Sequence, residues 1–249
     1  MDESAPTGLA RLWQPADSPD RRPRLGLSLD RVVEAAIALA DEGGLEAVSM
    51  ARVAERLGFT TMSLYRYVAN KDELLLFMHD RAWLPADYTD DVDRPWRPRL
   101  ADWTTQMRAT LLRHLWLEQV RTTERIGTPS QLFWQDAGLA TLADTPLREH
   151  EKSQVLLLLN AHVFHDARVI SDFMAAERGG RSYEETAGAY FELIRRVTAD
   201  GQYPALRRAV EARAFDDVTQ TEFADIDSLF RFGLDCILDG VERLVARRA

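Results

Sequence analysis

A helical hydrophobic period, recurring from residue 27 almost to the end of the chain, constrains the fold more than any other feature. Apolar residues lie three and four positions apart in one segment after another, and no segment of useful length alternates between apolar and polar residues as a strand does. This spacing predicts an all-α fold. The predicted helical segments lie at about residues 28–44, 49–58, 61–68, 70–85, 100–117, 129–144, 148–180, 182–201 and 225–248.

The first four segments are bounded by residues that favour helix ends. Ser28 and Ser49 can accept hydrogen bonds from the first free backbone N–H groups of a helix, and Gly58 ends the second segment. Asn70 stands three residues before Glu73, which is a capping-box arrangement. Three short helices, with a glycine-containing turn between the second and third, predict a helix-turn-helix unit. An αα-hairpin in another helical bundle would give a similar pattern.

Proline and charge mark the predicted domain boundaries. Residues 1–26 contain four prolines and show no periodicity, which predicts a flexible N-terminal arm. A second stretch rich in proline and acid, residues 85–99, follows the fourth segment. We therefore predict a helix-turn-helix domain at residues 27–84 and a second helical domain at residues 95–249.

Composition predicts a cytoplasmic protein with no membrane partner. No window approaches eighteen uncharged apolar residues, and the acidic start lacks the basic region of a secretory signal. The single cysteine, Cys236, suits a reducing compartment. The net charge of −9 argues mildly against nucleic acid as a partner, but residues 21–81 contain nine basic and nine acidic residues. The whole negative excess therefore lies outside that segment.

The third helical segment carries more hydroxyl and aromatic groups than packing requires. Short side chains in its first turn would allow close approach to a major groove, where free backbone N–H groups can meet phosphates. Tyr65 lies four residues after Thr61 on one face, whereas Leu64 and Val68 form the opposite face and are predicted to pack inward. The alternative is that Tyr65 and Tyr67 only pack against neighbouring helices.

Residues 27–75 resemble the DNA-binding domain of the tetracycline-repressor (TetR) family of transcriptional regulators. The resemblance rests on A-x-x-L-G at the end of the second segment, on SLYRYV in the third and on NKDELL at the start of the fourth. It implies that the third segment is a recognition helix. The residues that it places at double-stranded DNA are Ser49, Thr60, Thr61, Met62, Ser63, Tyr65, Tyr67 and Lys71.

The resemblance also implies separate roles for these positions. Tyr67 and Lys71 would bind phosphate, Ser49 would approach the DNA backbone, and Thr60 would cap the recognition helix. The positions facing base edges or the groove would be Thr61, Met62, Ser63 and Tyr65.

The second helix departs from the pattern of some family members. Ala51 stands where those members carry a base-reading arginine, so more of the base reading would fall on the recognition helix. Arg22 and Arg24 in the arm could compensate by entering the minor groove or by neutralising phosphates. The alternative for these two arginines is a solvated tail.

Residues 95–249 resemble, more weakly, the C-terminal domain of tetracycline-repressor-like proteins, chiefly in RPWRPRLADWTTQMRATLLRHLWL. The resemblance implies a ligand-sensing helical bundle and a homodimer formed by the last long helices, at about 150–178 and 225–247. The run VLLLLNAHVF is apolar around most of its circumference, which is typical of a helix buried on two sides. A bundle within one chain would also bury it.

Aromatic side chains with few polar groups predict a pocket for a small, largely apolar effector in this second domain. Each aromatic taken singly is more often part of an ordinary core. His162, His165 and Asp166 suggest a metal site that His114 could join from another helix. His162 and Asp166 share one helical face, but no third ligand has convincing spacing, so neither a metal nor a cofactor is predicted. The candidate pocket residues are Trp103, Met107, His114, Phe133, Trp134, Asn160, Phe164 and Phe173.

The leading hypothesis is therefore a ligand-responsive DNA-binding regulator, usually a repressor in the resembled family, which an effector releases from a palindromic operator. An all-α enzyme or a small-molecule-binding protein that uses the aromatic cavity is the alternative. The sequence contains no nucleotide loop, paired metal motif or nucleophile elbow, so we expect no enzyme. A regulator that has lost its ligand response is a third possibility.

Overall fold

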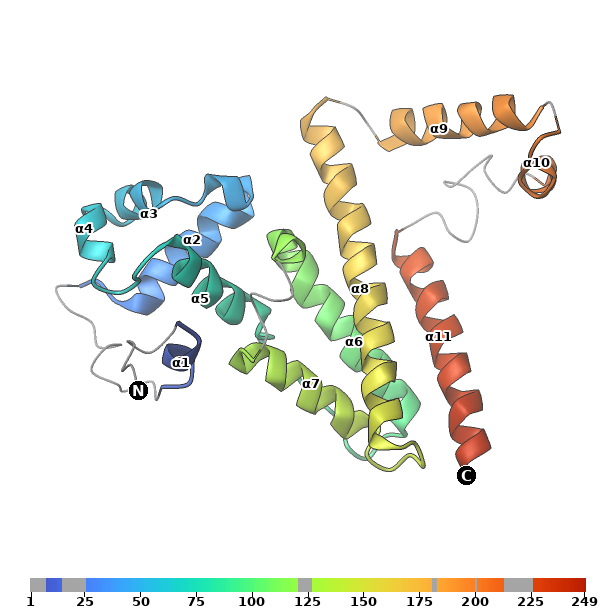
Figure 1. Ribbon diagram of the computed structural model, residues 1–249, viewed down its shortest axis with the longest axis horizontal. Coiled ribbons are helices and arrows are strands. Elements are labelled where there is room, and N and C mark those ends of the chain that lie inside the picture. Colours follow the sequence, from blue (N-terminus) through green and yellow to red (C-terminus); the bar gives the residue numbers. More distant parts are fainter. Residues whose placement is uncertain (1–7, 15–25, 121–126, 181–182, 200, 213–225) are drawn as a thin grey trace, which may run out of the picture. The chain divides into compact units, whose positions relative to one another are not determined.

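The all-α prediction is confirmed in a computed structural model, which describes residues 8–14, 26–120, 127–180, 183–199, 201–212 and 226–249. These residues form helices and the loops between them, and none of them belongs to a strand of a sheet (Figure 1). The chain divides into two compact units, Met1–Leu157 and Leu158–Ala249.

The first unit contains the predicted helix-turn-helix domain together with the first helices of the predicted second domain. Within it α2 packs on α3 and α5, α5 packs on α7, and α6 packs on α7, so the contacts continue across residues 85–94. Two 3-10 helices, η1 (Leu45–Ala47) and η2 (Leu115–Gln119), also belong to this unit. The α-helices are α1 (Gly8–Leu12), α2 (Leu29–Gly43), α3 (Met50–Leu57), α4 (Thr61–Leu64), α5 (Lys71–Trp83), α6 (Trp96–Arg113), α7 (Pro129–Thr141) and the start of α8 (Glu149–Arg178).

The capping residues act as the sequence predicted. The hydroxyl oxygens of Ser28 and Ser49 each accept a hydrogen bond of 3.2 Å from the backbone N–H three residues further on. The side-chain oxygen of Asn70 accepts the N–H of Glu73 at 2.8 Å, and the Glu73 carboxylate accepts the N–H of Ala69 at 2.6 Å. The predicted cap therefore begins α5, with Glu73 bonding the N–H of the residue before Asn70 rather than that of Asn70 itself.

The turn between α3 and α4 depends on Gly58. Its φ of 74° lies in the left-handed region, and its N–H bonds back to the carbonyls at the end of α3. α4 then ends at Leu64, four residues before the predicted end at Val68, because the chain continues as a hydrogen-bonded turn to Tyr67. Thr60 precedes α4 but its hydroxyl contacts the Ser63 hydroxyl at 3.1 Å instead of capping a backbone N–H.

Two groups of fully buried side chains hold the first unit together. The first lies among α2, α3, α4 and α5, and the second lies between α6, α7 and η2. The core of the first group contains Val32, Val53, Leu64, Val68 and Leu74. The core of the second contains Leu100, Met107, Leu111, Leu117 and Leu142.

Part of the predicted flexible arm is a helix. Residues Gly8–Leu12 form α1, which packs on α5 and buries Leu12. The expectation of a structureless arm over residues 1–26 is therefore corrected for this segment, because its contacts come from residues distant in the sequence. Arg22 and Arg24 lie outside the described residues.

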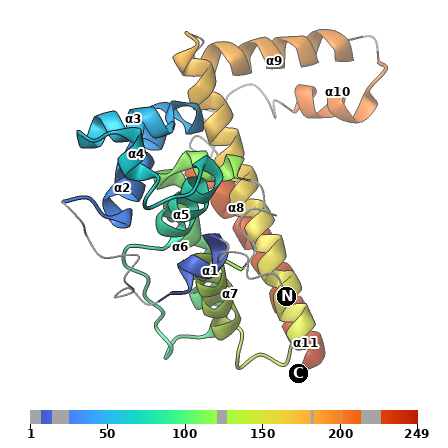
Figure 2. The ribbon, with the colours of Figure 1, turned by 60° about the vertical axis from the view of Figure 1, so that its left-hand side comes forward.

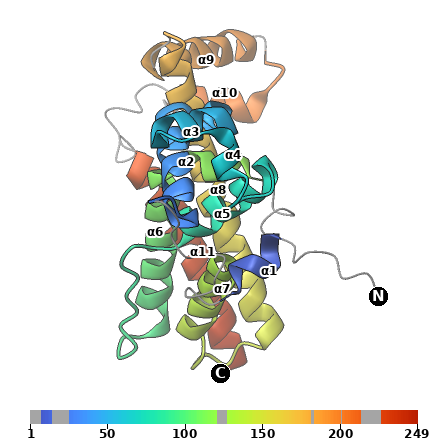
Figure 3. The same cartoon turned by 90° about the vertical axis from the view of Figure 1, so that its left-hand side faces the viewer.

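The second unit consists of the rest of α8 with α9 (Tyr183–Thr198), α10 (Pro204–Glu211) and α11 (Ile226–Arg248). α9 packs on α10, a short helix that the sequence analysis did not predict. α8 and α11 run side by side (Figures 1 and 3) and are tied where His162 Nε2 donates to the carbonyl oxygen of Phe230 at 2.9 Å. A Cβ added at Gly233 would lie 2.4 Å from a ring carbon of His162, so the absence of a side chain there permits this close approach.

None of the described helices combines the length and the apolar character that a bilayer crossing requires.

Candidate functional site

α4 and the turn that follows it, residues 61–68, have the two faces that the sequence predicted. Leu64 and Val68 are fully buried, whereas Met62 is 72 % exposed and Tyr65 is 47 % exposed. Figure 1 shows α4 beside α3, joined to it by the tight turn. A large apolar side chain and a large aromatic side chain are thus exposed on a helix whose other face is fully packed. Exposed side chains of this kind are typical of a binding surface.

Most of the predicted DNA-contacting residues reach solvent. The exposed members of the set are Thr60, Met62, Tyr65 and Lys71. The half-buried members, which still reach the surface, are Ser49, Thr61 and Ser63. The set is therefore accessible to a partner, with a single exception.

The exception is Tyr67, for which a phosphate contact was predicted. Its ring is only 6 % exposed, and its hydroxyl donates a hydrogen bond of 2.9 Å to the carbonyl oxygen of Leu27. A buried tyrosine needs an acceptor for its hydroxyl, and the residue before α2 supplies one. The predicted phosphate contact is therefore not available to this hydroxyl in the described conformation.

Two further cations are exposed in this part of the chain. They are Arg52 on α3 and Arg66 after α4, and neither was predicted as a DNA contact. The signal that could have identified Arg66 was a basic residue in the middle of the recognition segment. Arg56 differs, because it forms two hydrogen bonds of 2.8 and 2.5 Å to Glu42 on α2. That pairing raises the pKa of Arg56 and lowers the pKa of Glu42.

The aromatic residues predicted to line a pocket form a packed cluster in the first unit. Trp103 and Trp134 are 1 % and 3 % exposed, and the Trp103 indole N–H donates to the Trp134 carbonyl oxygen at 3.0 Å. The Trp134 indole N–H in turn donates to the Trp83 carbonyl oxygen at 2.7 Å. These contacts favour the alternative of an ordinary core. The rings around Trp134 are those of Trp83 at 5.9 Å, Tyr88 at 5.7 Å, Trp103 at 6.3 Å and Phe133 at 5.8 Å between centroids.

An ion pair anchors the predicted linker at residues 85–99. Arg99 donates to both carboxylate oxygens of Asp90, at 2.8 and 2.7 Å, and also to the Ala140 carbonyl oxygen at 3.1 Å. The Arg99 guanidinium lowers the pKa of Asp90. Burial, with a smaller contribution from the charge of Asp90, raises the pKa of Tyr88 to about 12. The linker is therefore held against α6 and α7.

His114 contacts the helix-turn-helix domain. Its Nδ1 lies 2.8 Å from the Asp41 carboxylate on α2, and the same oxygen accepts the Trp116 indole N–H at 2.8 Å. Of the two partners of Asp41, His114 lies at the end of α6 and Trp116 lies in η2. One carboxylate of α2 thus joins this helix to a predicted pocket residue, a contact that sequence spacing could not indicate.

The predicted pocket residues divide between the two units. Trp103, Met107, His114, Phe133 and Trp134 lie in the first unit. Asn160, Phe164 and Phe173 lie half-buried on the part of α8 that belongs to the second unit. A single pocket formed by all eight residues therefore remains a prediction.

The histidines suggested as metal ligands have other surroundings. His162 uses Nε2 to bond a carbonyl oxygen, and its ring stacks on Phe230 with centroids 4.8 Å apart. His165 is exposed. Within the described part of the chain, no group of three or more histidine, cysteine or acidic side chains could hold a metal ion.

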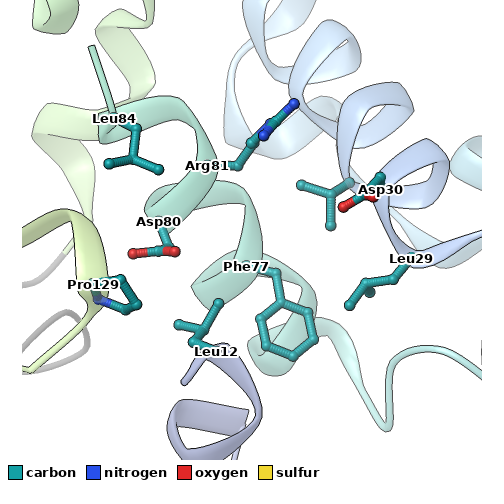
Figure 4. A pocket seen from close by; sticks show the side chains of 9 residues that line it. Leu12, Leu29, Asp30, Phe77, Asp80, Arg81, Leu84 and Pro129 are labelled. Atoms are coloured by element: carbon teal, nitrogen blue, oxygen red, sulfur yellow. The ribbon is translucent and has the colours of Figure 1, made fainter. Parts of the chain in front are cut away.

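A different hollow lies in the first unit, among α1, α2, α5 and α7 (Figure 4). Its volume is about 240 Å³. Asp80 adds a buried carboxylate to its wall and accepts the backbone N–H of Ser130 at 2.8 Å. The apolar lining includes Leu12, Val33, Phe77, Leu84 and Pro129.

Models of two protein domains match the chain. Residues 32–78 match bacterial regulatory proteins of the tetR family, and residues 89–245 match the tetracyclin repressor-like C-terminal domain. The first match contains α3 and α4, and the second contains α6 to α10 and most of α11.

Similar proteins are regulators. The HTH-type transcriptional repressor DrrR1 of Streptomyces coeruleorubidus is 38 % identical over 242 residues, which cover 96 % of this chain and 86 % of that protein. The class A tetracycline repressor from transposon 1721 of Escherichia coli is 28 % identical over 230 residues, covering 89 % and 94 %. The predicted alternative of an all-α enzyme finds no support in these relatives.

Solved structures share the fold. Apo ActR from Streptomyces coelicolor matches with a TM-score of 0.71 at 23 % identity, covering 91 % of this chain and all of that one. ActR in complex with actinorhodin matches with a TM-score of 0.68 at 23 % identity, covering 88 % of this chain and 98 % of that one.

Proposed function

Because the chain belongs to the tetracycline-repressor family of transcriptional regulators, we propose that it is a cytoplasmic repressor whose homodimer binds a palindromic operator until a small, largely apolar effector releases it. The observation that carries this proposal is the two-faced α4. Its inner face is fully buried, and its outer face presents Met62 and Tyr65 beside short hydroxyl side chains.

The proposed DNA surface is formed by α4, the start of α3 and the start of α5. Thr61, Met62, Ser63 and Tyr65 would meet base edges, because short and flexible side chains let a helix approach the major groove closely. Ser49 at α3 and Lys71 at α5 would contact phosphates, and Arg66 is an added candidate because it is exposed. In this division, phosphate contacts fix the position of the helix and base contacts give sequence preference.

The proposed homodimer uses α8 and α11. Leu158 on α8 is 53 % exposed, and on α11 Leu229 is 47 % and Phe232 is 58 % exposed in the single chain. Large apolar side chains on two adjacent helices of one unit are what a second copy would cover. Two copies would bind half-sites spaced about 34–36 Å apart, or a multiple of that distance.

The proposed effector binds the second predicted domain and favours a dimer whose two DNA-binding heads do not fit the operator. An effector changes this equilibrium only if it binds one arrangement better than the other. A relative is called a repressor, and ActR has been crystallised in complex with actinorhodin. The contact between His114 and Asp41 is the described link by which α6 and η2 could displace α2.

The test of DNA binding begins with selection of duplexes from a random-sequence library by the full-length protein. We expect enrichment of one palindrome and binding that weakens steeply as salt rises, because phosphate contacts release counterions. Equal affinity for a scrambled duplex would contradict the proposal. Titration of the complex with candidate ligands, followed by tryptophan fluorescence, separates a responsive regulator from one without a ligand response.

The surface itself is tested by the double variant Thr61→Ala with Tyr65→Ala. It should bind the selected palindrome at least about tenfold more weakly, because a good base contact contributes about 1–3 kcal/mol of discrimination. Thermal melting should be nearly unchanged, since Tyr65 is 47 % exposed. Tyr203→Ala, just before α10, is the matched control, because Tyr203 is 51 % exposed and lies outside the proposed surface. Unchanged affinity of the double variant would exclude α4 as the recognition helix.

A further inference from the structure

We propose that residues 8–14 form a strap that holds the recognition unit in position, and that Arg11 is its positioning residue. This inference rests on the proposed function, because DNA binding is the activity that the strap would support. α1 lies beside α5 (Figure 2) and reaches both the end of the recognition segment and the loop before α7.

Arg11 makes three separate contacts. Its Nη1 donates to the Glu73 carboxylate at 2.7 Å, and its Nη2 donates to the Tyr67 carbonyl oxygen at 2.8 Å. Its guanidinium carbon lies 5.3 Å from the centroid of the Phe77 ring, within the range of a cation–π contact. The side chains of Arg11 and Glu73 are only 17 % and 9 % exposed. Charge-assisted hydrogen bonds in such surroundings are stronger than bonds between neutral groups.

The acceptors of Arg11 are the two ends of the connection between α4 and α5. Tyr67 ends the turn that follows α4, and Glu73 belongs to the capping box that begins α5. α4 has only four residues, so few backbone hydrogen bonds of its own fix its position. One guanidinium therefore fixes the distance between the recognition segment and the helix that follows it.

The packing of α1 is close enough to give this contact a fixed geometry. A Cβ added at Gly8 would lie 2.9 Å from the Glu73 side chain, which shows how near the backbone of α1 lies to α5. Leu12 is buried and forms part of the wall of the hollow together with Phe77 (Figure 4). At the other end of the strap, the Trp13 indole N–H donates to the Gly127 carbonyl oxygen at 3.0 Å.

A direct contact between Arg11 and DNA would require a different arrangement. Each terminal nitrogen of its guanidinium already donates one hydrogen bond to a protein acceptor, and one face of the group lies over Phe77. These contacts favour a positioning role for Arg11 over the phosphate or minor-groove role that was predicted for Arg22 and Arg24. Its contribution to DNA binding would come from holding α4 in place before the DNA arrives, which lowers the ordering cost of binding.

Salt dependence separates positioning from phosphate contact. Arg11→Met keeps an unbranched apolar stem over Phe77 and removes both hydrogen bonds. We expect roughly tenfold weaker binding to the selected palindrome, with an unchanged slope of log affinity against log salt. Lys71→Met should instead make the slope shallower by about 0.9, the value for one phosphate contact on duplex DNA. Arg208→Met on α10 is the control for the change of net charge, because Arg208 is exposed and lies in the second unit.

Two results would overturn the strap. One is a slope for Arg11→Met that becomes shallower by about 0.9, because that shows a direct phosphate contact. The other is an affinity equal to that of Arg208→Met, because the hydrogen bonds of Arg11 would then have no effect on binding. If wild-type protein enriches no duplex, that result counts against the proposed function. The strap is then tested by hydrogen exchange, which needs no DNA.

Hydrogen exchange tests the strap without DNA. In the full-length protein, Arg11→Met should raise the exchange rates of the backbone amides between Tyr67 and Leu74 several-fold, while Arg208→Met leaves them unchanged. Unchanged rates in Arg11→Met would overturn the proposal. If Arg11→Met does not fold, Arg11→Lys replaces it, because lysine keeps the charge but lacks the planar fork that reaches two acceptors. Arg11→Lys should give smaller changes in the same direction, and wild-type rates would overturn the proposal equally.

Discussion

At the scale of single residues, two ion pairs in the first unit differ in exposure and should differ in their contribution to stability. The side chains of Arg99 and Asp90 are 7 % and 17 % exposed, whereas those of Arg94 and Asp102 are 44 % and 51 % exposed. Asp90→Asn should lower the free energy of unfolding by about 2 kcal/mol, because a partly buried guanidinium loses a charged partner. Asp102→Asn should cost less than about 1 kcal/mol. Urea unfolding at pH 7 measures both, and equal losses would contradict this assignment.

The same pair predicts a dependence on pH. Arg99 lowers the pKa of Asp90 from its ordinary value of 3.8, so the folded state favours the ionised carboxylate. The stability that this provides is complete above the ordinary pKa and is lost as pH falls through the lowered one. The difference between wild type and Asp90→Asn should therefore shrink on acidification below about pH 4. A difference that stayed constant would show that the charge of Asp90 is not its source.

Single residues also show the limit of inference from spacing. The spacing of four predicted that Leu64 and Val68 face inward, which the structure confirms. It left open whether Tyr67 packs inward or binds phosphate, because the acceptor of its hydroxyl at Leu27 lies 40 residues away in the sequence. The contact of His114 with Asp41 joins residues 73 positions apart, so the spacing of residues within one helix could not predict it either.

At the scale of helices, the sequence predicted those helices whose ends are marked by nearby capping residues. Serine and asparagine caps placed the starts of α2, α3 and α5 correctly, because each cap acts within three residues of itself. α1 and α10 were missed, since they have five and eight residues and are too short to show a clear period. Such short helices are stabilised by contacts with other helices, and these contacts cannot be predicted from the residues of the short helix alone.

The crossing of α8 and α11 gives a prediction at this scale. Gly233→Ala should lower the free energy of unfolding by about 1–3 kcal/mol, because its methyl group would force the His162 ring out of place. Gly188→Ala on α9 is the control, since open space surrounds that position. It should leave stability unchanged or raise it by up to about 1 kcal/mol. Thermal melting compares the two, and equal melting temperatures would contradict the close packing at Gly233.

At the scale of the whole molecule, the proposed homodimer depends on apolar side chains that one chain leaves exposed. Phe232 on α11 is 58 % exposed, and Tyr203, just before α10, is 51 % exposed. Phe232→Glu should convert the dimer into a monomer, because a charge would be buried against the second copy. Tyr203→Glu should leave the dimer intact. Sedimentation velocity distinguishes these outcomes, and a dimer that survives Phe232→Glu would place the interface elsewhere.

Loss of the dimer should also weaken operator binding far more than it changes the fold, because two heads bind one palindrome together.

The sequence could indicate the oligomeric state only through resemblance to a family. Composition and periodicity predicted an all-α chain with a long, largely apolar helix in its second domain. Neither of them indicates how many copies of the chain assemble. The compact units likewise differ from the predicted domains, since α5, α6 and α7 pack together across the linker.

The division of α4 into a buried face and an exposed face bears on how such a regulator can evolve. Met62 and Tyr65 contribute little to the core, so substitutions there should change the proposed DNA contacts without greatly changing the stability of the fold. Leu64 and Val68 are fully buried, so substitutions there should instead lower the stability of the fold. A duplicated copy of this gene could therefore acquire a new operator through a few outward substitutions and keep its inherited scaffold intact.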